Sequence, residues 1–119
     1  HFRWSMKQQG AILAKGWLLG LQFSAILQNG LYLDLARHAL AAADRIRAGL
    51  RELGIPCLVD SPSNQIFPIL PPDKARRLMD ACACEPQGSA GDGLCVRFVT
   101  SWATRDSDVD ALLRLLRAL

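Results

Sequence analysis

One apolar stretch, residues 11–27, constrains the fold of this chain more than any other feature. Lys15 is its only charged residue, and its apolar side chains would surround a helix on all sides. Such a helix is buried, either in protein or in a membrane. A membrane span needs about 20 consecutive apolar residues, whereas glycines and polar residues interrupt this shorter run. We therefore predict one long helix over residues 6–28, buried between two bodies of protein.

That helix also predicts partners. A domain of 119 residues has a small core and could hardly cover an all-apolar helix by itself. We therefore expect a missing domain, a second subunit, or both. The sequence starts at His1, with no signal-peptide pattern behind it. We expect it to begin within a longer protein.

The rest of the chain predicts an α+β domain over residues 31–119, with residues 1–30 as an interface helix. Apolar residues recur at three- and four-residue steps over residues 31–53, which is typical of a surface helix. Further helices are expected over residues 74–84 and after a Thr104 cap, and strands over residues 57–59, 65–70 and 94–101. Pro68 makes the second strand an edge or bulged strand. Residues 85–93 have the composition of a flexible loop. Short strands backed by helices favour two layers with a mostly antiparallel sheet.

Composition excludes several classes of function. The net charge of +3 is small and its arginines are dispersed, which argues against nucleic-acid binding. The cysteines are Cys57, Cys82, Cys84 and Cys95, and Cys82-Ala-Cys84 lacks the spacing of a zinc site. We expect reduced structural cysteines, with disulfides or metal binding as the alternatives. There is no nucleophile-elbow motif, no phosphate-cradling glycine loop and no cluster of metal ligands.

Arg97 is the most informative polar residue, because it stands inside the apolar run Val96-Arg97-Phe98-Val99. Burying an arginine is costly unless it is paired. Its planar guanidinium binds a carboxylate through two parallel hydrogen bonds. Two interpretations remain open: an internal salt bridge or surface arginine, and a site for a ligand carboxylate.

Other polar residues give weaker signals. Lys7 precedes the predicted apolar helix, where a cation is unfavourable unless an anion such as phosphate binds there. The alternative is a solvated lysine. The string from Asp60 to Asn64 is either a tight turn or a binding turn. His38 lies on the polar face of its helix, and we expect it to be solvated.

Three segments carry a resemblance to a known family. They are FRWSMKQQGAILAKGWLLG (residues 2–20), VDSPSNQIFPILP (residues 59–71) and VRFVTSWAT (residues 96–104). Together they resemble the C-terminal third of low-specificity L-threonine aldolases and related β-eliminating lyases. These are fold-type-I enzymes that depend on pyridoxal phosphate (PLP). No counterpart in the family can be assigned to residues 83–93 from the sequence.

The resemblance implies part of a lyase that cleaves L-threonine-type β-hydroxy-α-amino acids to glycine and an aldehyde. A larger N-terminal domain would hold PLP on a lysine. The lysines of this chain, Lys7, Lys15 and Lys74, do not lie in such a motif, so the chain alone is expected to be inactive. Arg97 resembles the arginine that binds the substrate α-carboxylate. Lys7 falls where the family has a basic residue near the cofactor phosphate. The parent is expected to be a cytoplasmic homo-oligomer, a dimer or a tetramer.

Two alternatives remain open. The chain could be a free-standing, non-catalytic α+β module that binds an amino acid or a partner protein. It could also be part of another fold-type-I PLP enzyme, such as an aminotransferase or a β-eliminating lyase. Fold-level likeness alone cannot separate these activities.

Overall fold

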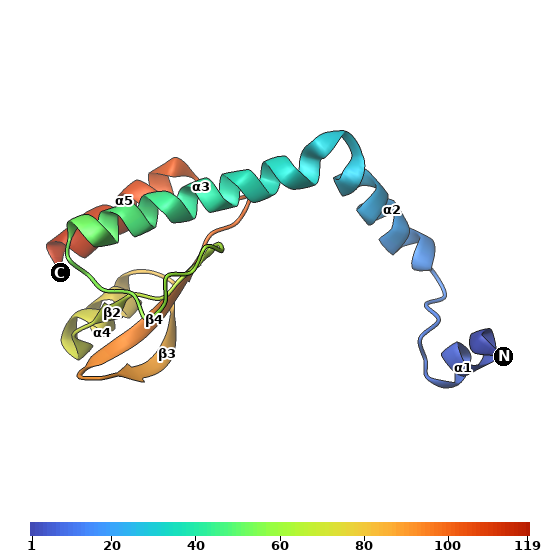
Figure 1. Ribbon diagram of the computed structural model, residues 1–119, viewed down its shortest axis with the longest axis horizontal. Helices are drawn as coiled ribbons and strands as arrows, with labels where there is room; N and C mark the ends of the chain where they lie inside the picture. The colour runs from blue at the N-terminus through green and yellow to red at the C-terminus, as the bar shows by residue number, and fades with distance from the viewer. The chain divides into compact units, whose positions relative to one another are not determined.

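The computed structural model describes residues 1–119 and divides into two compact units, His1–Asp34 and Leu35–Leu119. Each unit is described by itself. The elements in chain order are α1 (Phe2–Gln8), α2 (Gly16–Leu27), the 3-10 helix η1 (Gln28–Gly30), α3 (Leu31–Glu52), β1 (Gln65–Ile66), β2 (Ile69–Leu70), α4 (Pro72–Ala81), β3 (Glu85–Ala90), β4 (Gly93–Val99) and α5 (Asp106–Ala118) (Figure 1).

The first unit corrects the prediction of one continuous helix over residues 6–28, because α1 and α2 are separate helices. Gly10 has a φ of +67°, in the left-handed region that glycine adopts at helix ends. The N–H of Ala11 then donates to the carbonyl of Met6 over 2.9 Å, which closes the end of α1. The glycine just before the apolar run therefore ends a helix.

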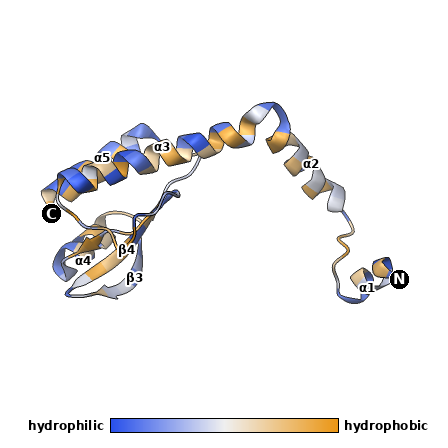
Figure 2. Cartoon of the chain, in the orientation of Figure 1, coloured by the Kyte–Doolittle hydropathy of each residue, from blue (hydrophilic) through white to orange (hydrophobic).

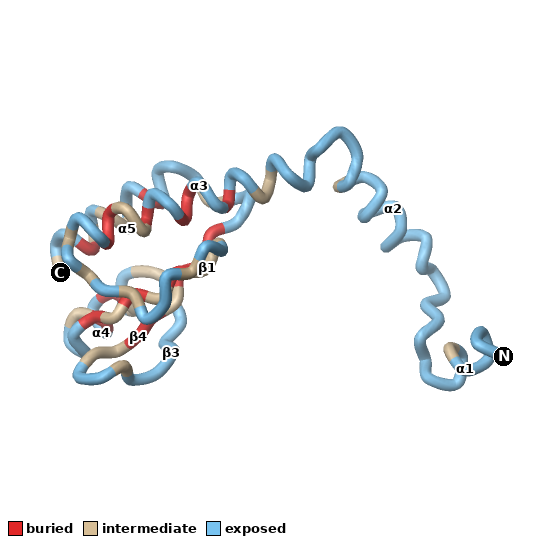
Figure 3. The backbone as a smooth tube through the Cα atoms, in the orientation of Figure 1, coloured by how far each residue is buried: buried red, intermediate tan, exposed pale blue.

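No residue of α2 is buried within this chain. Figure 2 shows hydrophobic residues along α2, and Figure 3 shows the same helix as exposed. Trp17 is 67% exposed and Phe23 is 66% exposed. No helix has the length and apolar character that crossing a membrane requires. The expected burial of this helix against other protein stays a prediction.

The second unit is organised around α3, whose bounds agree with the prediction to within one residue. Its buried residues recur along one face: Ala39, Ala42, Ala43, Ile46, Gly49 and Leu50. Helix α5 packs against this helix. Arg45 of α3 donates to Asp106 over 2.5 Å and to Asp110 over 2.6 Å, both on α5. At Gly49, an added Cβ would lie 2.3 Å from Leu113 Cδ2, so the missing side chain lets α3 and α5 approach closely.

Strand β4 is the centre of the antiparallel sheet. Strands β1 and β2 follow one register along β4, with Gln65 opposite Val99 and Ile69 opposite Cys95. Pro68 lies in the gap between β1 and β2, and the register is the same on both sides of this gap. Of the two expectations for this strand, a bulge at Pro68 is therefore wrong, and an edge position agrees with the strand order. The predicted strand over residues 57–59 is wrong, since only one bridge forms, between Cys57 and Pro68.

Strand β3 pairs with β4 along most of its length and corrects the prediction of a flexible loop over residues 85–93. The turn Gly91-Asp92 joins the two strands, and Gly91 has a φ of +59°. The sequence EPQGSA has poor strand propensity, but pairing to an existing strand outweighs propensity in a sheet. Register shifts between Pro86 and Gly88, which marks an irregularity where these two residues fit poorly into a ladder.

The core confirms an α+β domain with a short antiparallel sheet. Its buried members come from helices and strands alike: Ala42, Ala43, Ile46, Leu50, Ile66, Leu70, Ala75, Leu78, Val96, Phe98, Val109 and Leu116. Helix α4 begins at Pro72, two residues before the predicted start. Helix α5 has Arg105 as its N-cap residue, so the prediction of a Thr104 cap is wrong. Thr104 Oγ1 instead accepts a 2.9 Å hydrogen bond from the N–H of Ser101.

Candidate functional site

Arg97 lies on the side of β4 that faces away from the core. Alternate residues of a strand point to opposite faces. Val96 and Phe98 are buried in the core, whereas Arg97 is half-buried and Val99 is 56% exposed. The apolar run that contains Arg97 therefore reflects burial of one face of the strand. The arginine is presented on the other face by a strand that is anchored in the core.

Glu85, the first residue of β3, lies directly opposite Arg97 in the strand register. Arg97 Nη2 donates a hydrogen bond to Glu85 Oε2 and forms an ion pair with it. The side chain of Arg97 is 31% exposed and that of Glu85 is 66% exposed. Cross-strand pairs of opposite charge stabilise a sheet modestly. One of the two interpretations of Arg97, an internal ion pair, is thus what the structure shows.

The guanidinium of Arg97 is only partly satisfied by this pair. Its Nε atom is buried and has no hydrogen-bond partner. An unpaired buried donor costs about 1–3 kcal/mol. Arg97 and Glu85 also line a hollow of about 280 Å³, together with Ala83, Cys84 and Val99. The arginine therefore borders a space into which a small carboxylate could enter.

The surroundings of the cysteine in this hollow disfavour its thiolate form. Burial, together with the neighbouring Cys82, raises the pKa of the Cys84 thiol to about 11. A thiol with such a pKa is protonated at neutral pH, and only the thiolate is a strong nucleophile. Burial also raises the pKa of Cys57, Cys82 and Cys95. All four cysteines are free, and no cluster of three potential metal ligands forms.

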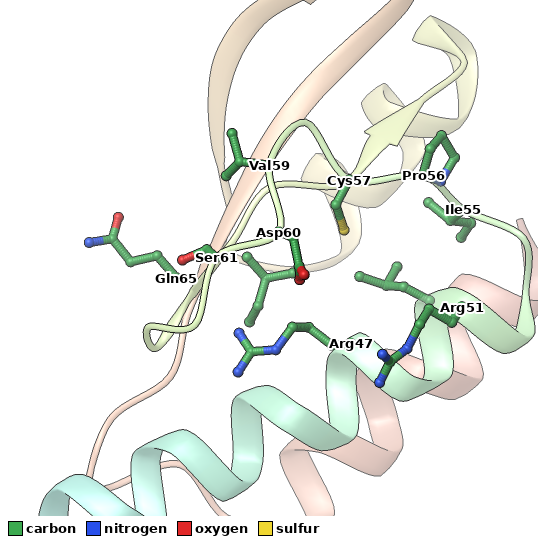
Figure 4. A pocket seen from close by; sticks show the side chains of 11 residues that line it. Arg47, Arg51, Ile55, Pro56, Cys57, Val59, Asp60, Ser61 and Gln65 are labelled. Atoms are coloured by element: carbon green, nitrogen blue, oxygen red, sulfur yellow. The ribbon is translucent and has the colours of Figure 1, made fainter.

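The turn from Asp60 to Asn64 is held by bonds within the protein. Arg47 Nη1 donates to the carbonyl of Ser63 over 2.8 Å, and Asn64 Nδ2 donates to the carbonyl of Thr100 over 2.6 Å. The turn also lines a hollow of about 270 Å³. Figure 4 shows the side chains of Asp60, in this turn, and of Cys57, just before it, pointing toward the arginines of α3. These hydrogen bonds are those of a tight turn. The bond from Asn64 to Thr100 fixes the chain at the end of β4.

Lys7 lies in the first unit, in the last turn of α1. Its Nζ lies 5.8 Å from the centroid of the Trp4 ring, and with Arg3 and Trp4 it lines a hollow of about 200 Å³. We expected Lys7 near the N-terminus of the apolar helix, where the helix dipole disfavours a cation. This expectation is wrong, because Lys7 lies in the last turn of a separate helix, α1. A cation is favourable there. Its role at a cofactor phosphate stays a prediction.

His38 is not simply solvated, as the sequence suggested. Its Nε2 donates a 2.7 Å hydrogen bond to the carbonyl of Thr104 in the segment before α5. Sequence analysis also missed Glu85, because it lies in the segment that was predicted to be a loop. A carboxylate in register with an arginine becomes visible only when the pairing of the two strands is known.

Comparison with solved structures now identifies the relationship. A Leishmania major threonine aldolase matches with a TM-score of 0.90 and 36% sequence identity over 98% of this chain. Over nearly its whole length, the chain is similar in sequence and fold to a threonine aldolase. Its fold is that of the C-terminal domain of a threonine aldolase. The match covers 34% of the Leishmania protein, so this chain spans about a third of the length of that relative.

Other matches show the fold alone. A Sphingomonas wittichii serine palmitoyltransferase matches at 18% identity with a TM-score of 0.58, over 69% of this chain and 23% of that one. A serine palmitoyltransferase from S. paucimobilis with a bound PLP-myriocin aldimine matches at 15% identity with a TM-score of 0.55, over 70% and 24% of the two chains. No protein-family model and no curated protein matches the sequence.

The residues of this chain do not make a complete PLP site. PLP enzymes of this kind bind the cofactor covalently through a lysine. The hollow beside Arg97 contains no lysine. Lys7 and Lys15 are exposed, and Lys74 lines a separate hollow with Leu53, Ile69 and Arg117. What the second unit offers is an arginine suited to a carboxylate.

Proposed function

We propose that this chain is the C-terminal part of a PLP-dependent lyase that cleaves β-hydroxy-α-amino acids, such as L-threonine, to glycine and an aldehyde. The observation that best supports the proposal is Arg97, a half-buried arginine that borders an open hollow on a strand anchored in the core. The similarity to a threonine aldolase, over 98% of the chain, supports an amino-acid carboxylate as the ligand of that arginine.

Arg97 binds and orients the substrate in this proposal. Two parallel N–H groups of a guanidinium match the two oxygens of an α-carboxylate. Fixing the carboxylate limits the rotation of the amino acid, so the bond to be cleaved is held in one orientation. Arginine remains charged in proteins and transfers no proton. The role of Arg97 is therefore positioning through direct contact with the substrate.

The cofactor would be held by protein outside this chain, because the chain lacks a suitable lysine. PLP supplies the electron sink for the cleavage when it is bound. Lys7 is proposed to contribute a positive charge near the cofactor phosphate. The exposed apolar surface of α2 is proposed to pack against the PLP-bearing domain and against a second subunit. Exposed apolar patches of this kind typically mark protein interfaces.

The test is the cleavage of L-threonine by the complete enzyme that contains this chain, followed as acetaldehyde release. Arg97→Ala is expected to raise KM by roughly ten- to a hundredfold, since a charge-assisted hydrogen bond contributes about 1.5–3 kcal/mol. PLP should remain bound. Arg114→Ala, at an exposed position of α5, is the matched control and should leave KM unchanged. An unaltered KM in Arg97→Ala would remove this residue from the site.

A further inference from the structure

The pairing of Arg97 with Glu85 joins the two strands of one hairpin. Arg97 lies in VRFVTSWAT, which resembles the threonine aldolase family, and Glu85 lies in residues 83–93, which carry no recognisable sequence motif of that family. The structure shapes this segment into β3 and places the Glu85 carboxylate on the Arg97 guanidinium. The first residue of β3 thus supplies the same chemical group that a substrate would bring.

We propose that Glu85 is a built-in competitor of the substrate carboxylate. It holds Arg97 while the site is empty, and it must leave when an α-carboxylate binds. Glu85 then sets the affinity of the site, and it favours ligands whose carboxylate can replace its own over ligands with a neutral amide. This inference rests on the proposed function, because it assigns Arg97 to substrate binding.

The geometry allows the exchange. Glu85 is 66% exposed, so its carboxylate can turn into solvent without losing a buried position. It is the first residue of β3, and the strand register is irregular just beyond it, between Pro86 and Gly88. Exposed ion pairs are weak, since water and salt screen both charges. Breaking the pair therefore removes only a modest stabilisation.

The guanidinium of Arg97 can also form more hydrogen bonds after the exchange. Glu85 engages Nη2, while the buried Nε has no acceptor. An arginine binds a carboxylate most strongly when two of its N–H groups donate in parallel. A ligand that enters the hollow of about 280 Å³ is not tied to β3 and can adopt that arrangement. One carboxylate replaces another, so the charge around Arg97 is unchanged.

The test measures acetate binding to the 119-residue chain at constant ionic strength. Binding is followed by the NMR signal of the Arg97 Nε–H group, with chloride as the control anion. Wild type is compared with Glu85→Gln, which keeps the shape of the side chain and removes its charge. The matched control is Glu52→Gln, because Glu52 is 70% exposed and forms a comparable surface pair with Arg117 at 3.8 Å.

Glu85→Gln is expected to bind acetate about two- to fivefold more tightly than wild type, the range that exposed ion pairs supply. Glu52→Gln should match wild type. Arg97→Lys in the Glu85→Gln background has no Nε–H group, so it is followed by the backbone amide signal of residue 97, and it should bind acetate more weakly. Equal affinity in wild type and Glu85→Gln, or a response away from Arg97, would overturn the inference. Circular dichroism of each variant separates these outcomes from misfolding.

The measurement also distinguishes this inference from the proposed function. Acetate binding requires neither PLP nor cleavage of threonine. If the complete enzyme fails to cleave L-threonine while Glu85→Gln still tightens acetate binding, the proposed function is wrong and the competition between carboxylates stands. If the enzyme cleaves L-threonine and Glu85→Gln changes neither acetate binding nor KM, only the inference about Glu85 is wrong.

Discussion

The hydroxyl of Thr100 donates a 2.7 Å hydrogen bond to the carbonyl oxygen of Ala39. This bond joins the residue that follows β4 to the buried face of α3. Thr100 is 2% exposed and is the buried polar residue of the core. Its backbone N–H also donates to the carbonyl of Asn64 over 3.0 Å, so three segments meet at this residue.

Thr100→Val should therefore destabilise the second unit by about 1 kcal/mol, because valine keeps the shape of threonine but cannot donate to Ala39. Urea unfolding followed by circular dichroism measures the change. Ser107→Ala, at an exposed position of α5 without a side-chain hydrogen bond, is the control. A stability equal to wild type would show that the Thr100 hydroxyl contributes nothing to folding.

Gly49→Ala should destabilise the contact between α3 and α5. The new Cβ would lie 2.3 Å from Leu113 Cδ2 and 3.3 Å from its Cγ, so Leu113 must shift. Overpacking typically costs about 1–3 kcal/mol, and the better helix propensity of alanine returns up to about 1 kcal/mol. The free energy of unfolding should fall by about 1 kcal/mol. Gly20→Ala in α2 meets no atom within 4 Å and should slightly increase helix content instead.

The stability of the second unit should fall as the pH rises from 9 to 11. The pKa of Cys84 is raised from 9.0 to about 11 in the folded chain, mainly by burial. Above pH 9 the unfolded chain loses this proton while the folded chain keeps it, so unfolding becomes easier. Urea midpoints across this range measure the effect. Cys84→Ala should flatten the curve, and an unaltered curve would contradict the assignment to Cys84.

The apolar surface of α2 should make the isolated chain associate. Trp17 and Phe23 are each about two thirds exposed, and apolar surface of this kind is removed from water by association. Sedimentation velocity should show mass that increases with chain concentration. Replacing both residues with arginine should give a monomer, while Ala41→Arg on the exposed side of α3 should not. A wild-type monomer at all concentrations would contradict this expectation.

The sequence by itself determined the elements whose signal is local. The three- and four-residue spacing of apolar residues predicted α3, because a helix buries one stripe. The run around Arg97 predicted β4, and Pro68 indicated an edge position for the strand that contains it, because proline cannot donate to a ladder. Gly10 is a local signal for the end of α1, but the apolar composition of the residues after it favoured one continuous helix instead.

Only the tertiary structure decided which residues meet. Strand β3 has a loop-like composition and exists because β4 offers it a pairing edge. That pairing places Glu85 on Arg97, and the packing of α5 places Thr104 within reach of His38. His38 and Thr104 are 66 positions apart, whereas Glu85 and Arg97 are 12 apart in one hairpin, and no periodicity relates either pair. Local patterns record which face of an element is buried, whereas the partner of a polar side chain depends on how distant elements pack.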